Sequence, residues 1–436
     1  MVLDVSSRST EQARMLERAT AVMPGGTLGY FRLPDDVQLV VREGRGSKLY
    51  DVDGREYLDY VLGSGPMLIG HAHPAVTAAV TAQLARGTTF YIATEEAIRL
   101  AEKICELSPC AELVRFVSTG NEAVSMALRL ARAYRKRDTI LKFEGGFHGV
   151  GDYAQYSVTP KGEPNFPHAR SESAGVPKVL DQTVLIAPFN DLETTGRIIA
   201  EHADELAAVI IEPLQRSIVP KPGFLQGVRQ ITRDHGIPMM LDEVVTGFRL
   251  APGGAQEYYE VECDLASYGK AVSGGYPLAA VAGRADIMSL CDPRRSQESD
   301  YVQISGTLSG NPVAAVAGLA TLEVLSQPGT HARLRMIGDQ IRDGLAEIGR
   351  RVGLPLQAPG EASVFQPIIS EHEVMDARTL AKQDAKMTYA FGVELVREGI
   401  LMNPGSKMYV STVHDEADVA RTLEAAERAL RRVASR

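Results

Sequence analysis

Three short segments carry residue types that could hold a charged small molecule and react with it. The first, STGNEA (118–123), follows an apolar run and opens a helical stretch. The second, MMLDEV (239–244), ends a buried run with an acidic pair. The third, YGKAVSGG (268–275), places one lysine among small residues. An anion site, a carboxylate and a reactive amine are therefore the chemistry that this sequence offers.

The segment 118–123 has the form of a phosphate site at a helix start. The first N–H groups of a helix lack intrahelical partners and carry partial positive charge, so they bind anions. Gly120 would let the backbone approach the anion, and the Ser118 and Thr119 hydroxyls could donate to it. The alternative is simple helix capping by Thr119 or Asn121. Neither a P-loop nor a dinucleotide-binding glycine fingerprint is present, which disfavours ordinary nucleotide sites.

Asp242 stands at the carboxyl end of an apolar run, where ligands gather in open α/β sheets. A carboxylate there could hold a protonated ring nitrogen or a metal ion. Alternatively, Asp242 caps the next element or pairs with Arg249. The stretch offers too few ligands for a metal, and the His71-Ala-His73 pair has no third ligand cluster near it in sequence. We therefore predict no metal site.

Lys270 follows the next apolar run and has only small residues around it. Desolvation lowers the pKa of an amine, and a neutral amine is the nucleophile that forms Schiff bases with carbonyl compounds. A single lysine is more often a solvated surface charge, so Lys270 alone is weak evidence. No Ser/His/Asp or Cys/His nucleophilic arrangement can be assigned.

The elements that must position these residues are short apolar runs separated by amphipathic helical stretches. Such a pattern predicts an α/β fold whose mostly parallel sheet is covered by helices. The expected strands are Leu113–Val117, Thr139–Phe143, Thr183–Ala187, Ala208–Ile211, Met239–Leu241, Leu265–Tyr268 and Leu278–Ala282. The expected helices between and after them include Asn121–Arg137, Asp191–Leu206, Leu225–His235 and Glu416–Arg432.

The rest of the chain divides around this core. Residues 61–315 are expected to form the large domain, with residues 1–60 and 316–436 forming a small α+β domain. A hairpin turn is predicted at Asp51-Val-Asp-Gly54. Residues 151–182 are irregular and rich in Pro, Gly and Ser, which is typical of a functional lid or of a disordered segment.

Composition narrows the class of protein further. The net charge is −9, from 46 basic and 55 acidic residues, and no basic cluster suggests a nucleic-acid partner. No apolar run approaches the roughly 20 residues that span a membrane, and the first residues lack a secretory signal, so a cytoplasmic location is expected. The four cysteines show neither zinc spacing nor the density of a disulfide framework.

Taken in order, these motifs resemble the class III aminotransferases, which use pyridoxal 5'-phosphate (PLP) and have PLP fold type I. The resemblance covers nearly the whole chain and is closest to the branch of glutamate-1-semialdehyde aminomutases and amino-acid transaminases. It implies a large domain with a seven-stranded sheet between helices, a small domain and a homodimer with shared active sites. It runs through MPGG (23–26), YDVDGREYLD (50–59), GHAHP (70–74), FVSTGNEA (116–123), FEGGFHG (143–149), IIEP (210–213), LDEVVTGFR (241–249), YGKAVSGGYP (268–277) and GTLSGNP (306–312).

The resemblance also implies a role for each residue. Lys270 would form the Schiff base with PLP and move the substrate proton, and Asp242 would pair with the ring nitrogen. The phosphate would bind at Thr119, Gly120 and Asn121. The ring would lie between Phe147 and Val244, and Thr307 would reach the phosphate held by the partner subunit.

Departures from the family pattern lie where the substrate would bind. The family usually has NSGTEA where this chain has STGNEA, and aminomutases have a tryptophan where this chain has Ser64. Arg32 has the spacing of the arginine that binds the substrate carboxylate, which a guanidinium can hold with two hydrogen bonds. Otherwise Arg32 is a solvated loop residue. Arg32 and Ser64 are the predicted substrate residues.

Two enzyme functions are consistent with these residues. The favoured function is an aminotransferase that moves an amino group from an amino acid to a keto acid. The alternative is a PLP-dependent isomerase, either an aminomutase of the glutamate-1-semialdehyde type or an amino-acid racemase or epimerase. A non-enzymatic scaffold is disfavoured because Lys270 and Asp242 are both retained. Neither the donor amino acid nor the acceptor can be deduced from the sequence.

Overall fold

The computed structural model describes residues 10–361 and 363–435, which form two compact units. One unit, the large unit, comprises residues 74–331 and 374–381. The other, the small unit, comprises residues 10–73, 332–361, 363–373 and 382–435. The domain boundaries proposed from the sequence, 61–315 with its two flanks, stay a prediction.

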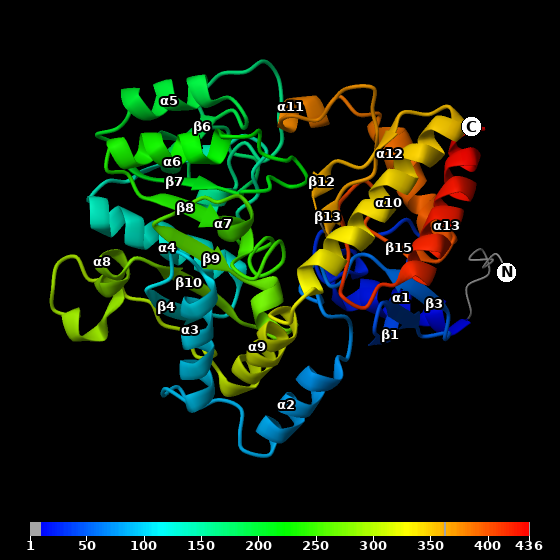
Figure 1. The fold of residues 1–436 in the computed structure, drawn as a ribbon, viewed down its shortest axis with the longest axis horizontal. Helices are drawn as coiled ribbons and strands as arrows, with labels where there is room; N and C mark the ends of the chain where they lie inside the picture. Colours follow the sequence, from blue (N-terminus) through cyan, green and yellow to red (C-terminus); the bar gives the residue numbers. More distant parts are fainter. Residues whose placement is uncertain (1–9, 362, 436) are drawn as a thin grey trace. The chain divides into compact units, whose positions relative to one another are not determined.

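A seven-stranded sheet forms the centre of the large unit, with strand order β4-β10-β9-β8-β7-β5-β6 (Figure 1). Strand β10 is antiparallel to both of its neighbours, and every other pair is parallel. The predicted seven-stranded, mostly parallel sheet is confirmed. The strands are β4 (Leu113–Val117), β5 (Thr139–Phe143), β6 (Val184–Ala187), β7 (Leu206–Ile211), β8 (Met239–Asp242), β9 (Leu265–Tyr268) and β10 (Ala279–Gly283).

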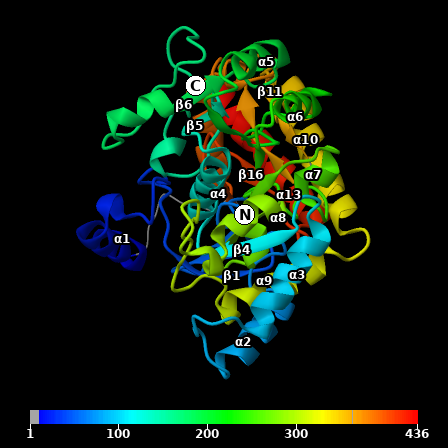
Figure 2. The same ribbon diagram turned by 90° about the vertical axis from the view of Figure 1, so that its left-hand side faces the viewer.

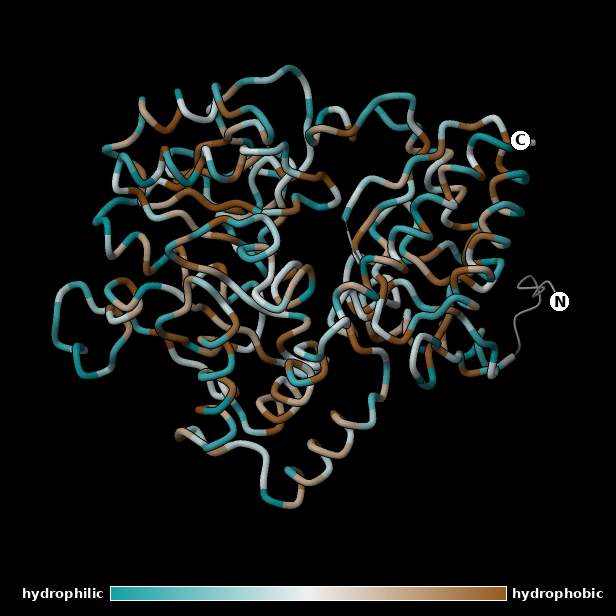
Figure 3. Tube along the Cα trace, viewed as in Figure 1, coloured by the Kyte–Doolittle hydropathy of each residue, from teal (hydrophilic) through white to brown (hydrophobic). Residues whose placement is uncertain are grey.

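Burial explains why these runs form strands. Strands β5, β7, β8, β9 and β10 are buried at every position, as expected of parallel strands covered on both faces. Figure 3 shows hydrophobic residues concentrated along them. Helix α4 packs on β7, β9 and β10, while α6 packs on β8.

The remaining helices of the large unit complete its core. Helix α9 contacts both α2 and α3, and the three lie side by side in both views (Figures 1 and 2). The helices are α2 (Pro74–Leu84), α3 (Glu95–Leu107), α4 (Gly120–Arg135), α5 (Leu192–Glu201), α6 (Phe224–Asp234), α7 (Gly254–Tyr258), α8 (Ala285–Met288), α9 (Pro312–Leu325) and α11 (Ala377–Leu380).

The irregular segment 151–182 is ordered in the structure. Tyr156 is fully buried, and its hydroxyl donates to Asp181 at 2.8 Å. Tyr153 and Phe166 pack against the core cluster beneath the segment. Of the two expectations for this segment, disorder is therefore wrong.

Among its described residues, the small unit combines short strands with four helices. The predicted hairpin at 51–54 is confirmed: Asp51 Oδ1 accepts the N–H groups of Asp53 and Arg55, and β2 pairs with β3. One sheet has the order β1-β2-β3-β15, and five two-residue strands form two smaller sheets. The helices are α1 (Thr10–Val22), α10 (Thr330–Val352, whose first two residues belong to the large unit), α12 (Ala385–Arg397) and α13 (Glu416–Ala434). The strands are β1 (Val41–Arg45), β2 (Lys48–Asp51), β3 (Glu56–Asp59), β11 (Leu356–Gln357), β12 (Gly360–Glu361), β13 (Val364–Phe365), β14 (Ile368–Ile369), β15 (Ile400–Leu401) and β16 (Met408–Tyr409).

Across the described parts of the chain, no helix is both long enough and apolar enough to cross a bilayer.

Candidate active site

The three chemical segments gather at one edge of the large sheet. Their candidate residues lie at or just after the carboxyl ends of β4, β8 and β9. Because β10 is antiparallel to both β4 and β9, those two strands point the same way. The carboxyl ends of β4, β8 and β9 therefore meet at the same edge, where open α/β sheets bind their ligands. This sheet order brings together Gly120 and Gly269, which are 149 positions apart in the chain.

Direct contacts show how closely the segments approach. A Cβ atom built on Gly120 would lie 2.9 Å from Val244 Cγ1. One built on Gly269 would lie 3.3 Å from the same atom and 3.6 Å from Gly120 Cα. The start of α4, the chain just after Asp242 and the residue before Lys270 are thus in mutual contact.

Helix α4 begins with a capping box. Thr119 Oγ1 accepts the N–H of Glu122 at 3.1 Å, and Glu122 Oε2 accepts the N–H groups of Ser118 and Thr119 at 2.8 and 2.9 Å. The capping role considered from the sequence is therefore real. It still leaves an anion site, because the Thr119 hydroxyl keeps its own proton to donate. The N–H groups of Gly120 and Asn121 belong to the first helical turn and have no intrahelical acceptor.

The Asn121 side chain has a second function at this helix start. Its Oδ1 accepts the N–H groups of Val150 and Gly151 at 2.8 and 2.7 Å. A Cβ atom at Gly149 would lie 2.6 Å from the same oxygen, on a backbone with a φ of +96°. Asn121 therefore fixes the loop after the FEGGFHG segment to the start of α4.

Asp242 is buried, with 5% of its surface exposed, and both of its oxygens have partners. Oδ2 lies 2.8 Å from Nδ1 of His148. Oδ1 accepts hydrogen bonds from the Ser267 hydroxyl and the Val244 N–H, each at 3.1 Å. A buried carboxylate is stable only when it is paired and hydrogen-bonded, and these contacts supply that while fixing its orientation.

The adjacent carboxylate, Glu243, has a structural role. It is fully buried and accepts hydrogen bonds from the Thr246 hydroxyl, the Ala255 N–H and the Gln256 side chain at 2.8, 2.7 and 3.1 Å. Burial raises the pKa of Glu243, although these hydrogen bonds oppose the shift. Of the acidic pair, only Asp242 belongs to the candidate site.

Lys270 is half-buried and begins the 3-10 turn Lys270–Ser273 directly after β9. Its backbone is left-handed, with a φ of +48°, and its carbonyl accepts the Ser273 hydroxyl at 2.7 Å. Non-glycine residues in this region are uncommon and concentrate at functional sites.

The loop after β5 carries Phe147. Its N–H donates to Glu212 Oε2 at 2.8 Å, and the Arg216 guanidinium lies 5.2 Å from the centre of its ring. Beneath the loop, the buried Lys142 amine donates to the Gly146 carbonyl at 3.0 Å. Burial lowers the pKa of Lys142 to about 8, opposed by the charge of Glu212.

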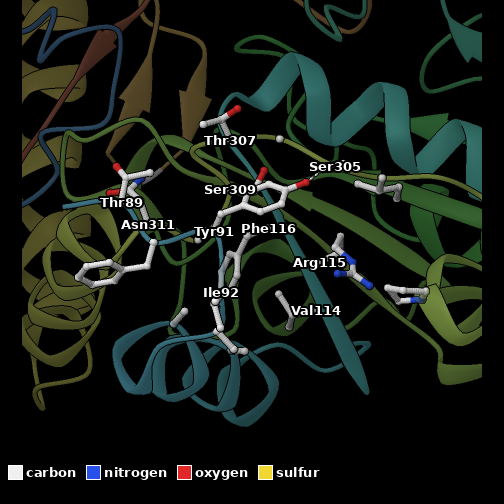
Figure 4. Close-up of a pocket in the computed structure, with 18 of the residues that line it drawn as sticks. Thr89, Tyr91, Ile92, Val114, Arg115, Phe116, Ser305, Thr307, Ser309 and Asn311 are labelled. Atoms are coloured by element: carbon white, nitrogen blue, oxygen red, sulfur yellow. Dashed lines mark hydrogen bonds between the residues drawn. The ribbon is translucent and has the colours of Figure 1, made fainter. Parts of the chain in front are cut away.

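Thr307 belongs to the segment before α9. It is exposed and lines a hollow of about 580 Å³ in the large unit. Figure 4 shows Thr307, Ser305 and Tyr91 in this hollow. The hydroxyls of Ser305 and Tyr91 are 2.8 Å apart. Tyr91 and Ile92 are 72% and 80% exposed here, so the hollow has an apolar rim.

Arg32 and Ser64 belong to the small unit. Arg32 is exposed and forms an ion pair with Asp35, three residues on. Ser64 is also exposed, in a turn where its N–H donates to the Val61 carbonyl at 2.8 Å. Their roles toward a substrate stay a prediction.

His148 is the main site residue that sequence reasoning missed. It is 3% exposed and bonded to Asp242, although it follows Phe147 directly in the FEGGFHG motif. Ser267, which supports the other oxygen of Asp242, was missed as well. A signal was available for His148, because the loop after β5 ends at the same sheet edge as β8.

Comparison with known proteins defines the class. The model of the family "Aminotransferase class-III" matches residues 32–365. The chain is 40% identical over 422 residues to a glutamate-1-semialdehyde 2,1-aminomutase of Methanothermobacter thermautotrophicus, covering 95% of this chain and 98% of that protein. It is 37% identical over 434 residues to glutamate-1-semialdehyde 2,1-aminomutase 2 of Brevibacillus brevis, covering 97% and 98%. An omega-transaminase structure from Sphaerobacter thermophilus matches with a TM-score of 0.92 and 36% identity, covering 98% of each chain.

The chain belongs to the class III aminotransferase family and has PLP fold type I. Its cofactor is PLP, which similar solved structures hold in its aldehyde or amine form. The aminotransferase activity favoured by the sequence analysis is corrected, because the curated relatives at 37 to 40% identity are aminomutases. Ser64 is a departure at a single position, whereas the similarity to aminomutases extends along 95% or more of the chain.

Proposed function

We propose that this protein is a PLP-dependent isomerase of the glutamate-1-semialdehyde aminomutase type. Such an enzyme moves an amino group from one carbon to the next within a single substrate. The observation that supports this proposal most strongly is the 40% identity to an aminomutase over 95% of the chain. Three features fit the cofactor that this chemistry needs. They are Asp242 with its hydrogen bond to His148, the start of α4 with its N–H groups, and Lys270 beside Gly269.

PLP supplies an electron-withdrawing ring that stabilises negative charge at the substrate carbon. Asp242 would pair with the ring nitrogen and keep it protonated, and His148 and Ser267 hold the Asp242 carboxylate in position. The N–H groups of Gly120 and Asn121, with the Thr119 hydroxyl, bind the phosphate.

Two groups act around the reacting carbons. The Lys270 amine would hold the cofactor before substrate binds. Once released, it would accept a proton from one substrate carbon and donate a proton to the neighbouring one. Phe147 and Val244 would pack against the cofactor ring and exclude water. The N–H of Phe147 bonds to Glu212, and Val244 lies against Gly120.

Arg32 is the proposed partner of the substrate carboxylate. Its guanidinium already pairs with the exposed carboxylate of Asp35, so a substrate would replace one carboxylate by another. Such an exchange costs little, because both partners are solvent-exposed and surface ion pairs are weak. Ser64 is proposed to line the same substrate region.

A second copy of the chain is the proposed partner. The hollow around Thr307 has an exposed apolar rim that includes Phe90, Tyr91 and Ile92, at 49%, 72% and 80% exposure. Burying such surface is the usual driving force of homodimer formation. A cytoplasmic location also stays part of this proposal.

The function is tested with glutamate-1-semialdehyde as the only substrate and no keto acid present. We expect many turnovers per enzyme to the isomer whose amino group is on the terminal carbon. Product formation that requires a stoichiometric keto acid would overturn the proposal. So would inversion of the amino-bearing carbon without movement of nitrogen, which chiral chromatography detects.

The Lys270→Ala variant provides the matched control for this assay. It should bind PLP without the borohydride-reducible link and show no isomerisation above background. A reducible link that persists in Lys270→Ala would show that another residue holds the cofactor.

A further inference from the structure

Two buried polar atoms face one small space beside Gly146. A Cβ atom built on Gly146 would lie 3.2 Å from His148 Nε2 and 3.6 Å from Gln215 Oε1. Both atoms are buried, and neither has a hydrogen-bond partner among the described residues. His148 and Gln215 are 3% and 0% exposed, so bulk water does not reach them. The missing side chain of Gly146 is what leaves this space.

The hydrogen bonds that Gln215 and His148 make away from Gly146 show whether their atoms near Gly146 donate or accept. The Gln215 Nε2 group donates to the Glu144 carbonyl at 2.8 Å, so the amide oxygen, an acceptor, faces Gly146. His148 Nδ1 lies 2.8 Å from Asp242, and because a carboxylate oxygen accepts, Nδ1 carries the proton. In the neutral ring Nε2 is then an acceptor too. Two acceptors cannot satisfy each other.

We propose that a water molecule binds beside Gly146 and donates one proton to His148 Nε2 and the other to Gln215 Oε1. Water is the small molecule with two donor hydrogens, and buried waters typically bridge polar groups that otherwise lack partners. The result is a chain of hydrogen bonds from Gln215 through water and His148 to Asp242. His148 and Gln215 are accordingly positioning residues for the carboxylate that pairs with the cofactor ring.

The surroundings keep the space rigid. The Gly146 N–H donates to the Phe143 carbonyl at 3.0 Å, and its own carbonyl accepts the Lys142 amine at 3.0 Å. Gln215 is held by the hydrogen bonds that its N–H and carbonyl exchange with Ile218. Fixed peptides therefore border the proposed water position on the Gly146 and Gln215 sides.

The first experiment is a pair of variants that remove the water in different ways. Gly146→Ala places a methyl group in the space, and Gln215→Leu removes one acceptor while keeping the volume similar. Each should weaken PLP binding about tenfold, the size of effect expected from one lost hydrogen bond. Each should also shift the pH at which the visible absorption of the lysine-bound cofactor changes, and in the same direction.

The double variant is the decisive comparison. If both substitutions act by removing one water, Gly146→Ala in the Gln215→Leu background has little further effect on the absorption titration. A remaining loss of stability is expected even then, because the new methyl group also lies 3.1 Å from the Phe143 carbonyl. Additive shifts of the titration, or no shift in either single variant, would overturn the proposal.

A matched control and a direct observation complete the test. Gly196→Ala, on α5, places its methyl group 3.1 Å from the Ile231 side chain and should leave the absorption titration unchanged. A crystal structure of the holoenzyme should show one ordered water between His148 and Gln215 that is missing in Gly146→Ala. A wild-type structure without that water refutes the inference.

This inference rests on PLP binding and not on the reaction. Absorption, cofactor affinity and crystallography report on it without turnover. If the isomerase assay fails while these results hold, only the proposed function is lost.

Discussion

The side chain of Val244 lies directly against Gly120, because a Cβ atom at Gly120 would be 2.9 Å from Cγ1 and 3.1 Å from Cγ2 of Val244. Both methyl groups of Val244 face Gly120. Rotating the Val244 side chain would therefore replace one close contact by another and would not make room for a Cβ atom. The close approach joins the helix start that is proposed to bind phosphate to the segment just after Asp242.

Gly120→Ala should therefore overpack this contact. We expect the apoprotein to lose about 1–3 kcal/mol of stability and the holoprotein to lose cofactor affinity. Thermal or urea unfolding and a PLP titration measure the two effects. Val244→Ala makes room, so Gly120→Ala should cost much less in that background. Equal cost in both backgrounds would show that Val244 is not the obstacle.

Thr307 should serve the active site of a partner subunit. Thr307→Asp places a carboxylate where phosphate oxygens are expected, and Lys270→Ala removes the reactive amine, so each variant alone should be inactive. Random mixing puts one complete site in half of the dimers and should restore about a quarter of wild-type activity. Tagged chains verify that mixed dimers form. No recovery in verified mixed dimers means that Thr307 serves its own chain.

Arg32→Ala should raise KM for the substrate by about tenfold or more while leaving kcat nearly unchanged, because a carboxylate contact away from the reacting carbons contributes uniform binding. Arg14→Ala is the matched control. Arg14 is also exposed and pairs with a carboxylate three residues away, Glu11 at 2.8 Å. Equal kinetics for both variants would remove Arg32 from the substrate site.

His414 should make the small unit sensitive to acid. Burial lowers its pKa to about 4, although Asp418 and Asp59 oppose the shift. Its ring stacks on Tyr60 at 4.7 Å, and Nδ1 accepts the N–H of Ser411 at 3.1 Å. Between pH 6.5 and 4 the unfolded chain binds a proton that the folded chain does not, so the unfolding free energy falls as the pH falls.

The full loss below pH 4 is of the order of 3 kcal/mol, at about 1.4 kcal/mol per pKa unit. His414→Asn keeps an acceptor for Ser411 but has no titrating ring. The difference in unfolding free energy between wild type and His414→Asn should therefore shrink through this window. A difference that stays constant with pH would contradict the assignment.

The large sheet could be predicted from the sequence because its strands are continuous apolar runs. Strand β9 matches the expected bounds, and β7 begins two residues earlier than expected because Leu206 and Ala207 are buried as well. The two-residue strands of the small unit, such as Leu356–Gln357, carry no periodicity and could not be recognised. Local pattern defines an element only when the element spans several residues.

The candidate site was predictable only in part. Asp242 ends the buried strand β8, and Lys270 comes after the buried strand β9. Both could therefore be recognised from the sequence as candidate reactive residues. The bond between His148 and Asp242 joins residues 94 positions apart and depends on β5, β7 and β8 being neighbours in that order. Likewise, the space beside Gly146 depends on Gln215, which reaches it from the loop after β7.

The left-handed backbone of Lys270 bears on how an inert form of the enzyme should be made for capturing ligands in crystals. Alanine at this position keeps a Cβ atom in a conformation that costs L residues about 1 kcal/mol or more, and glycine does not. A Lys270→Gly protein should therefore melt at a higher temperature than Lys270→Ala while being equally unreactive. The glycine form is the better choice for trapping a bound substrate.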